Sequence, residues 1–191
     1  MPWIIDYQVV LEQMHRQGMR CLYYNSGAFG FKDEQGPEVL GFVGPANETI
    51  RLEVRSRVRQ VAPPYEETLA TLARRIWQEH LGGRVWVMPK SHWAHELEHG
   101  SREWMAEVLE QIDLDAGLLV GRNNGAAIEF ANEEAGRFEL FTRKLLQLLA
   151  GSDFMLAFPG RPVLCTVHHH KQLWWVSSDI QWIDSIDPNQ L

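Results

Sequence analysis

Cysteine is scarce in this chain of 191 residues. Only Cys21 and Cys165 occur, and each lies within an apolar run. Two cysteines cannot supply the set of bridges that holds a small secreted domain together. We therefore interpret both as buried free thiols.

Long apolar runs are also lacking. No window approaches the roughly 18 consecutive apolar residues that a membrane-spanning helix needs. The opening stretch, MPWIIDYQVV, has neither the basic segment nor the long apolar segment of a secretory leader. The sequence therefore predicts a cytoplasmic protein with no membrane partner.

Basic residues are in the minority, with 18 Lys and Arg against 25 Asp and Glu and a formal net charge of -7. This balance argues against nucleic acid as a partner, because phosphates would be repelled. The glycine-containing turns lack the G-x-G-x-x-G and G-K-[ST] patterns of phosphate loops. No G-x-S-x-G nucleophile motif occurs either. The expected partner is a protein or a small molecule.

Tryptophan, by contrast, is abundant, with eight residues at positions 3, 77, 86, 93, 104, 174, 175 and 182. We expect most of them in the core, because tryptophan buries a large area. One or two could line a pocket for a flat ligand. The predicted ligand or partner surface contains Trp93, Trp174 and Trp175.

The chain shows signs of an internal repeat. Stretches that begin at Val10 and Val108 share Val-Leu-Glu-Gln and, at the same spacing further on, Asn-x-Gly-Ala. Each stretch has the pattern of an amphipathic helix followed by a hairpin. Asn and Gly tolerate the positive φ that tight hairpin turns require.

A longer helix and a short strand follow in each copy. The helices are predicted at 65–83 and 136–152, and both end in glycine. The strands are predicted at 84–89 and 153–159, where short apolar runs lead into proline. The repeated unit is therefore helix, hairpin, helix, strand.

These patterns predict an α+β fold with internal duplication of this unit, in which the helices pack on an antiparallel sheet. The first unit covers 1–100 and carries a two-strand insertion at about 39–60. The second covers 101–191, and the two units form one compact globular body. Its end is predicted as a hairpin over 161–178 and a loosely attached tail over 180–191.

One strand of the insertion, predicted within 48–61, alternates apolar residues with arginines: Ile50, Leu52, Val54 and Val58 against Arg51, Arg55, Arg57 and Arg59. Period-two alternation indicates a strand with one wet face. We interpret the arginine face as the solvated one, balanced by nearby carboxylates. Binding of phosphate or of an acidic partner is the alternative.

His95-Glu96-Leu97-Glu98-His99 spells H-E-x-x-H. On a helix, His95 and His99 would share one face as zinc ligands, and Glu96 would act as general base on a zinc-bound water. A third protein ligand would also be needed, for which Glu129 and His168 are candidates. The pattern predicts a zinc-dependent hydrolase only if the helix forms.

Two features weigh against that helix. Gly100 follows His99 directly, so the helix would end at its second ligand. The repeat instead aligns this segment with a predicted strand, in which Glu96 would face away from His95 and His99. We favour the interpretation that composition produces the motif by chance.

A second histidine cluster occupies His168, His169 and His170. In a strand, His168 and His170 would share a face, and the repeat places this cluster and the first one at corresponding positions. Imidazole suits several transition metals, so a metal or haem carrier is a further alternative. The five residues SHWAH also resemble a short stretch of haem-trafficking proteins of the hemin-degrading type.

The leading hypothesis is a non-catalytic binding or regulatory protein that holds a partner protein or small ligand at the joint of the two halves. The alternatives are the zinc-dependent hydrolase and the metal or haem carrier. No cofactor is expected under the leading hypothesis. Zinc or haem belongs to the alternatives.

Overall fold

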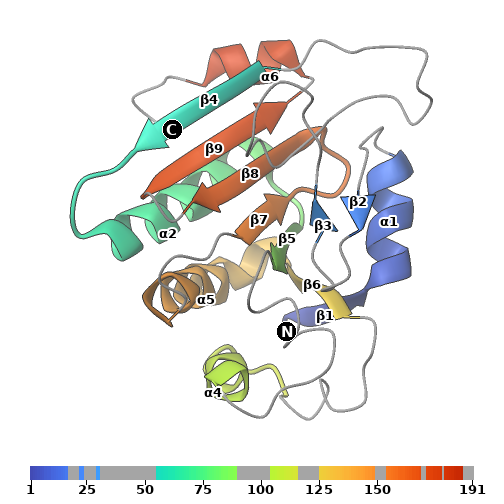
Figure 1. Cartoon of the computed structure of the whole chain (residues 1–191), viewed down its shortest axis with the longest axis vertical. Coiled ribbons are helices and arrows are strands. Elements are labelled where there is room, and N and C mark those ends of the chain that lie inside the picture. Colours follow the sequence, from blue (N-terminus) through green and yellow to red (C-terminus); the bar gives the residue numbers. More distant parts are fainter. Residues whose placement is uncertain are drawn as a thin grey trace.

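The computed structural model describes residues 1–16, 22–23, 29–30, 55–89, 104–115, 125–148, 154–168, 171–177 and 179–186. A seven-stranded sheet, antiparallel throughout, forms its centre, and five α-helices accompany it (Figure 1). The predicted α+β class, with helices on an antiparallel sheet, is confirmed. No helix among the described residues is long and apolar enough to cross a membrane.

The strands of this sheet lie in the order β1-β6-β5-β7-β8-β9-β4. Their bounds are β1 (Trp3–Asp6), β4 (Arg55–Gln60), β5 (Val85–Pro89), β6 (Gly125–Phe130), β7 (Phe154–Ala157), β8 (Val163–His168) and β9 (Gln172–Ser177). β1 and β4 are therefore its two edge strands among the described residues. A separate pair, β2 (Leu22–Tyr23) and β3 (Phe29–Gly30), forms a small second sheet.

The helices are α1 (Tyr7–Arg16), α2 (Tyr65–Ile76), α4 (Trp104–Glu110), α5 (Ala135–Leu148) and α6 (Ile180–Ser185). α2 continues into a π-helical turn, Trp77–Leu81, and the chain leaves it through Gly82 at φ 63°. Glycine adopts this left-handed conformation without steric cost. The predicted helix that ends in glycine is confirmed here.

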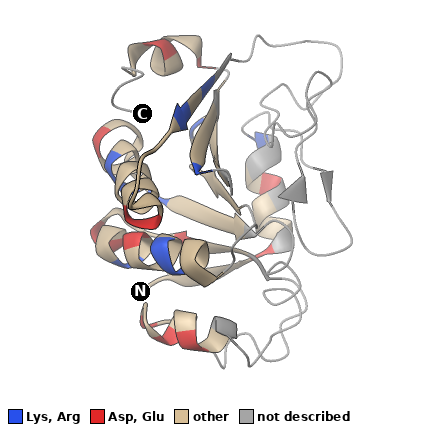
Figure 2. Ribbon diagram, turned by 60° about the vertical axis from the view of Figure 1, so that its left-hand side comes forward, with Lys and Arg blue, Asp and Glu red and all other residues tan. Residues whose placement is uncertain are grey.

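One face of the sheet carries an apolar row that crosses six strands and ends in an arginine. Directly opposite neighbours along it are Ile4, Ile128, Val87, Leu156, Cys165, Trp175 and finally Arg57 on β4. The apolar members are at most 2% exposed. They form one hydrophobic cluster with residues of α2, α4, α5 and α6. Figure 2 shows α2 and α5 on this side of the sheet and α1 on the other.

Aromatic rings fill the core where α2 and α5 meet the sheet. Trp77 packs edge-on against Phe138, with 5.1 Å between ring centroids, and Phe138 contacts Phe130 of β6 in the same manner at 5.7 Å. Trp77, Trp86 and Trp175 are at most 2% exposed. These three tryptophans lie in the core, which was expected for most of the eight, whereas Trp3 on the edge strand β1 is 56% exposed.

Two predictions about the chain's periphery are wrong. Residues 180–186 are not a loose tail, because they form α6 and its exit, and both Ile183 and Ile186 are buried in the core. The exposure of the two faces of β4 is also the reverse of the prediction, which made the arginine face the solvated one. Val58 is 52% exposed, while Arg57 and Arg59 lie on the helix-covered face and are only partly exposed.

Candidate functional site

The first histidine cluster lies outside the described residues, as do the residues predicted with it: Trp93, His95, Glu96 and His99. His170 also lies outside them. His168 ends β8, where its backbone is opposite Gln172, and its side chain is not described. Within the described parts of the chain, no group of three His, Cys, Asp or Glu side chains is placed to hold a metal ion.

Glu129, a candidate third zinc ligand, is engaged within the protein. Its Oε1 lies 2.7 Å from Arg84 Nη1, and its Oε2 accepts a hydrogen bond of 2.8 Å from Trp86 Nε1. The side chain is 14% exposed. Both oxygens are therefore used in holding the sheet face together.

The two adjacent tryptophans of β9 point to opposite faces of the sheet, as neighbours in a strand must. Trp175 is fully buried and stacks on Phe158, with 5.9 Å between centroids. Trp174 is half-buried, and its Nε1 donates to Gln172 Oε1 at 2.7 Å. Of this pair, Trp174 is the one that a ligand can reach.

Trp174 lies directly opposite Val58 of the edge strand β4. On the other face of the same strand, a groove of about 680 Å³ opens between the end of β4 and α2. Its described lining residues are Arg59, Gln60, Val61, Ala62, Pro63, Pro64, Glu67, Thr68, Thr71, Leu72 and Arg75. The β4 edge and this groove together form the candidate site.

The groove owes its shape to the connection between β4 and α2. Val61 closes the end of the strand, where its N–H donates to the Lys171 carbonyl at 3.2 Å. Two prolines then turn the chain into α2. Glu67, Thr71 and Arg75 follow at four-residue intervals, so they line one side of that helix.

Side-chain contacts fix the helical wall of the groove. Thr68 Oγ1 donates to the Pro64 carbonyl at 2.7 Å, and Thr71 Oγ1 donates to Glu139 Oε1 on α5. The other oxygen of Glu139 lies 2.6 Å from Arg74 Nε. α2 is thereby tied to α5 beside the groove, so the wall is held in place before any ligand arrives.

The groove is locally basic in a protein that is acidic as a whole. Its described lining has two arginines, Arg59 and Arg75, and one carboxylate, Glu67. Arg57, on the same strand face, lies 2.6 Å from Asp184 of α6. Figure 2 shows the basic segments of β4 at this end of the molecule. Guanidinium groups bind carboxylates and phosphates through paired hydrogen bonds, so the groove suits an acidic group.

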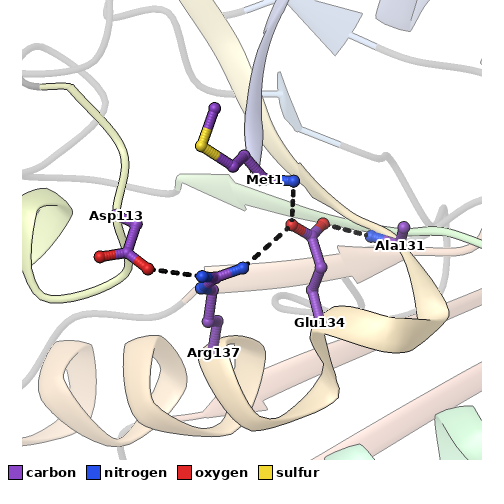
Figure 3. Close-up of polar contacts among 5 residues, drawn as sticks. All are labelled: Met1, Asp113, Ala131, Glu134 and Arg137. Carbon is purple, nitrogen blue, oxygen red and sulfur yellow. Dashed lines mark hydrogen bonds and ion pairs between the residues drawn. The ribbon is translucent and has the colours of Figure 1, made fainter.

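A second polar cluster surrounds Glu134, at the turn Asn132–Glu134 before α5 (Figure 3). Glu134 is 5% exposed, and its Oε2 accepts from the Ala131 N–H at 2.9 Å. Its Oε1 lies 2.6 Å from the Met1 ammonium and 3.7 Å from Arg137 Nη1. Arg137 also pairs with Asp113. Each charge has an opposite partner, so we assign this cluster to stability.

The thiol of Cys165 is also unsuited to chemistry. It lies in the apolar row of the sheet and is fully buried. Burial raises its pKa well above the usual range, because the thiolate would lose its hydration. Cys165 is therefore a packing residue, as predicted from the sequence. Cys21 lies outside the described residues.

The sequence interpretation missed most of the groove. The alternation in the strand predicts a solvated arginine face, and no motif singles out Thr68, Thr71 or Arg75. The available signal was the four-residue spacing of polar residues on α2 directly after two prolines. That signal does not show which helix side meets the end of a strand, because the answer depends on how α2 packs.

No protein-family model matches the chain, and no curated protein or solved structure shows significant similarity to it. Function is therefore inferred from the geometry of the β4 edge and its groove.

Proposed function

We propose that this protein is a non-catalytic binding protein that holds a partner segment or a small ligand with an acidic group in the groove between β4 and α2. The observation that carries the proposal is the presence of both Arg59 and Arg75 in the lining of a groove of about 680 Å³. That volume lies within the range of small-molecule sites, roughly 300–1,000 Å³.

The chemistry of the lining supports binding without catalysis. Among its described residues, the charged groups are Arg59, Arg75 and the exposed Glu67. Arginine stays protonated at any physiological pH, so it can neutralise an anion but is a poor general acid or base. No cysteine or histidine occurs in this described lining. The groove therefore has groups to hold an acidic ligand, and the hydroxyls of its described lining, Thr68 and Thr71, donate hydrogen bonds within the protein.

The proposed site lies at one edge of the sheet, where β4 of the first half pairs with β9 of the second. The two halves also meet where β5 and β7 pair, in the middle of the sheet. Both faces of that pair are buried: Val87 and Leu156 on one face and Met88 and Met155 on the other are all 0% exposed. The β4 edge offers a ligand accessible side chains, including the half-buried Trp174, whereas this joint does not.

We also propose that the two halves arose by duplication. The support is the repeated order of helix and strand, α2 with β5 and α5 with β7, together with the contact between the two helices and the pairing of the two strands. A duplicated hairpin predicts backbone NOEs between residues 117–121 and the start of β6. Absence of those NOEs would contradict the proposal. The test is strict, because β1 and β5 already pair with much of β6 and leave little of that strand for a hairpin partner.

Calorimetry with a capped Glu-Glu dipeptide tests the binding proposal, with a capped Lys-Lys dipeptide as the ligand control. Arg75→Gln should weaken Glu-Glu binding on the order of tenfold, because one charge-assisted contact is lost. Arg16→Gln is the matched protein control, since Arg16 is 69% exposed on α1, away from the groove. A basic groove would be contradicted if the unmodified protein, Arg75→Gln and Arg16→Gln bound Glu-Glu equally, or if the unmodified protein bound the two dipeptides equally.

A further inference from the structure

The outer edge of β4 presents backbone groups to whatever lies beside it. The Val61 N–H donates to the Lys171 carbonyl, one residue beyond the last pair of the β4–β9 register, Gln60 and Gln172. In an antiparallel pair, residues that bond to the partner strand alternate with residues whose N–H and C=O point away. Arg57 and Arg59 therefore bond toward β9, whereas the backbone groups of Ser56 and Val58 point outward. In the described sheet, the strand order ends at β4.

The two faces of this edge strand differ in chemistry. Arg57 and Arg59 lie on the face that α6 and the groove adjoin. Val58 lies on the opposite face, is 52% exposed and has the half-buried Trp174 as its cross-strand neighbour. A strand added beside β4 would place alternate side chains next to the arginines and next to Val58.

We infer that β4 accepts an extended segment of a partner protein as an eighth, antiparallel strand, and that this segment alternates apolar and acidic residues. This inference rests on the proposed function and names its ligand class. The acidic side chains lie opposite Arg57 and Arg59, and one of them reaches the groove lined by Arg59 and Arg75. The apolar side chains lie on the Val58 and Trp174 face. Main-chain hydrogen bonds contribute affinity, and side-chain alternation contributes specificity.

Charge complementarity argues for this occupant over a second copy of the chain. Two copies paired through β4 would bring arginines of one edge against arginines of the other, and like charges that face each other across strands are destabilising. Arginines on an edge can also serve to prevent pairing. The accessible Val58 and the groove beside Arg59 favour a receptive edge over a protected one.

The test is an NMR titration of the whole protein with a capped peptide of sequence Val-Glu-Val-Glu-Val. In the antiparallel register, valines lie opposite Ser56, Val58 and Gln60, and their N–H groups face β4. The glutamates lie opposite Arg57 and Arg59, and their N–H groups face away. One variant peptide is N-methylated at the valines and another at the glutamates, so that the side chains stay the same.

N-methylation of the valines should weaken binding at least about tenfold, because it removes the donors that face β4. N-methylation of the glutamates should leave the affinity within about threefold. Replacement of both glutamates by glutamine should weaken binding on the order of tenfold, since the carboxylates pair with the arginines. This set of results would support strand addition.

Other outcomes overturn the inference. No binding of the unmodified peptide would show that the arginines protect this edge. Equal effects of the two N-methylation patterns, or a loss confined to the glutamate pattern, would exclude the antiparallel register. In each of those cases the Glu-Glu titration decides the groove: if Arg75→Gln weakens Glu-Glu binding, strand addition fails while the proposed groove function stands. If Arg75→Gln leaves Glu-Glu binding unchanged, both fail.

Discussion

Trp175 and Arg57 are direct neighbours on β9 and β4, on the same face of the sheet. The tryptophan is fully buried under the helices, and the arginine, 34% exposed, pairs with Asp184 on α6. The apolar row of the sheet thus gives way to guanidinium groups within one strand. This change places a basic groove at the edge of an otherwise hydrophobic layer.

The Arg57–Asp184 pair should contribute only modestly to stability. Its side chains are 34% and 37% exposed, and partly solvated pairs are worth about 0.2–1 kcal/mol. A double-mutant cycle with Arg57→Gln and Asp184→Asn, followed by urea unfolding, measures the coupling free energy. We expect a value in that range that falls as salt is added. A coupling that is unaffected by salt would contradict this assignment.

Glu134→Gln should lower the free energy of unfolding by about 1–3 kcal/mol, because charged partners around a buried carboxylate lose their counter-charge. Glu133→Gln is the matched control: Glu133 lies in the same turn but is exposed, and its effect should stay within about 0.5 kcal/mol. Urea unfolding of both variants compares them. Equal losses would show that the Glu134 cluster has no special role in stability.

Much of the central fold could be predicted from local pattern. The two long helices, the strands that follow them and the hairpin of β8 and β9 are confirmed close to their predicted positions. The hairpin turns at Lys171, whose φ is 66°. These elements depend on helical spacing, glycine ends and short apolar runs, all of which are properties of neighbouring residues.

The rest depends on tertiary context that local pattern does not contain. Alternation in β4 correctly indicates two different faces, but it does not show that α6 would cover the arginine face. The segment 180–186 has four apolar residues of seven, but so short a helix does not show where it docks, and Ile183 and Ile186 complete the core beside Trp175. The groove arises from the same unpredicted arrangement. The predicted histidine sites lie largely outside the described residues, so they remain predictions.

Cys165 should make the protein less stable at alkaline pH. Its folded pKa is raised, so the unfolded chain loses the thiol proton first, at about pH 8.5. The stability from the buried neutral thiol is fully present below that pH and is lost as the pH rises toward the folded pKa. Cys165→Ala should therefore lose less stability between about pH 8.5 and 10 than the unmodified protein. Parallel pH dependences in urea unfolding would contradict this.

Elemental analysis of untagged protein, purified without chelator or added metal, tests the zinc alternative. We expect far less than one zinc ion per chain, because Glu129 is engaged and Gly100 would end a helix at His99. A His95→Ala, His99→Ala double variant is the comparison. One zinc ion per chain that is lost in the double variant would make the H-E-x-x-H motif the leading site.

The most direct test of the central claim is an amide chemical-shift map of the protein during titration with the capped Glu-Glu dipeptide. We predict that the largest shifts fall on residues 59–62 and 67–75, around the groove, and that they diminish in Arg75→Gln. Shifts that cluster elsewhere, such as on α1, or that persist unchanged in Arg75→Gln would contradict a binding site between β4 and α2.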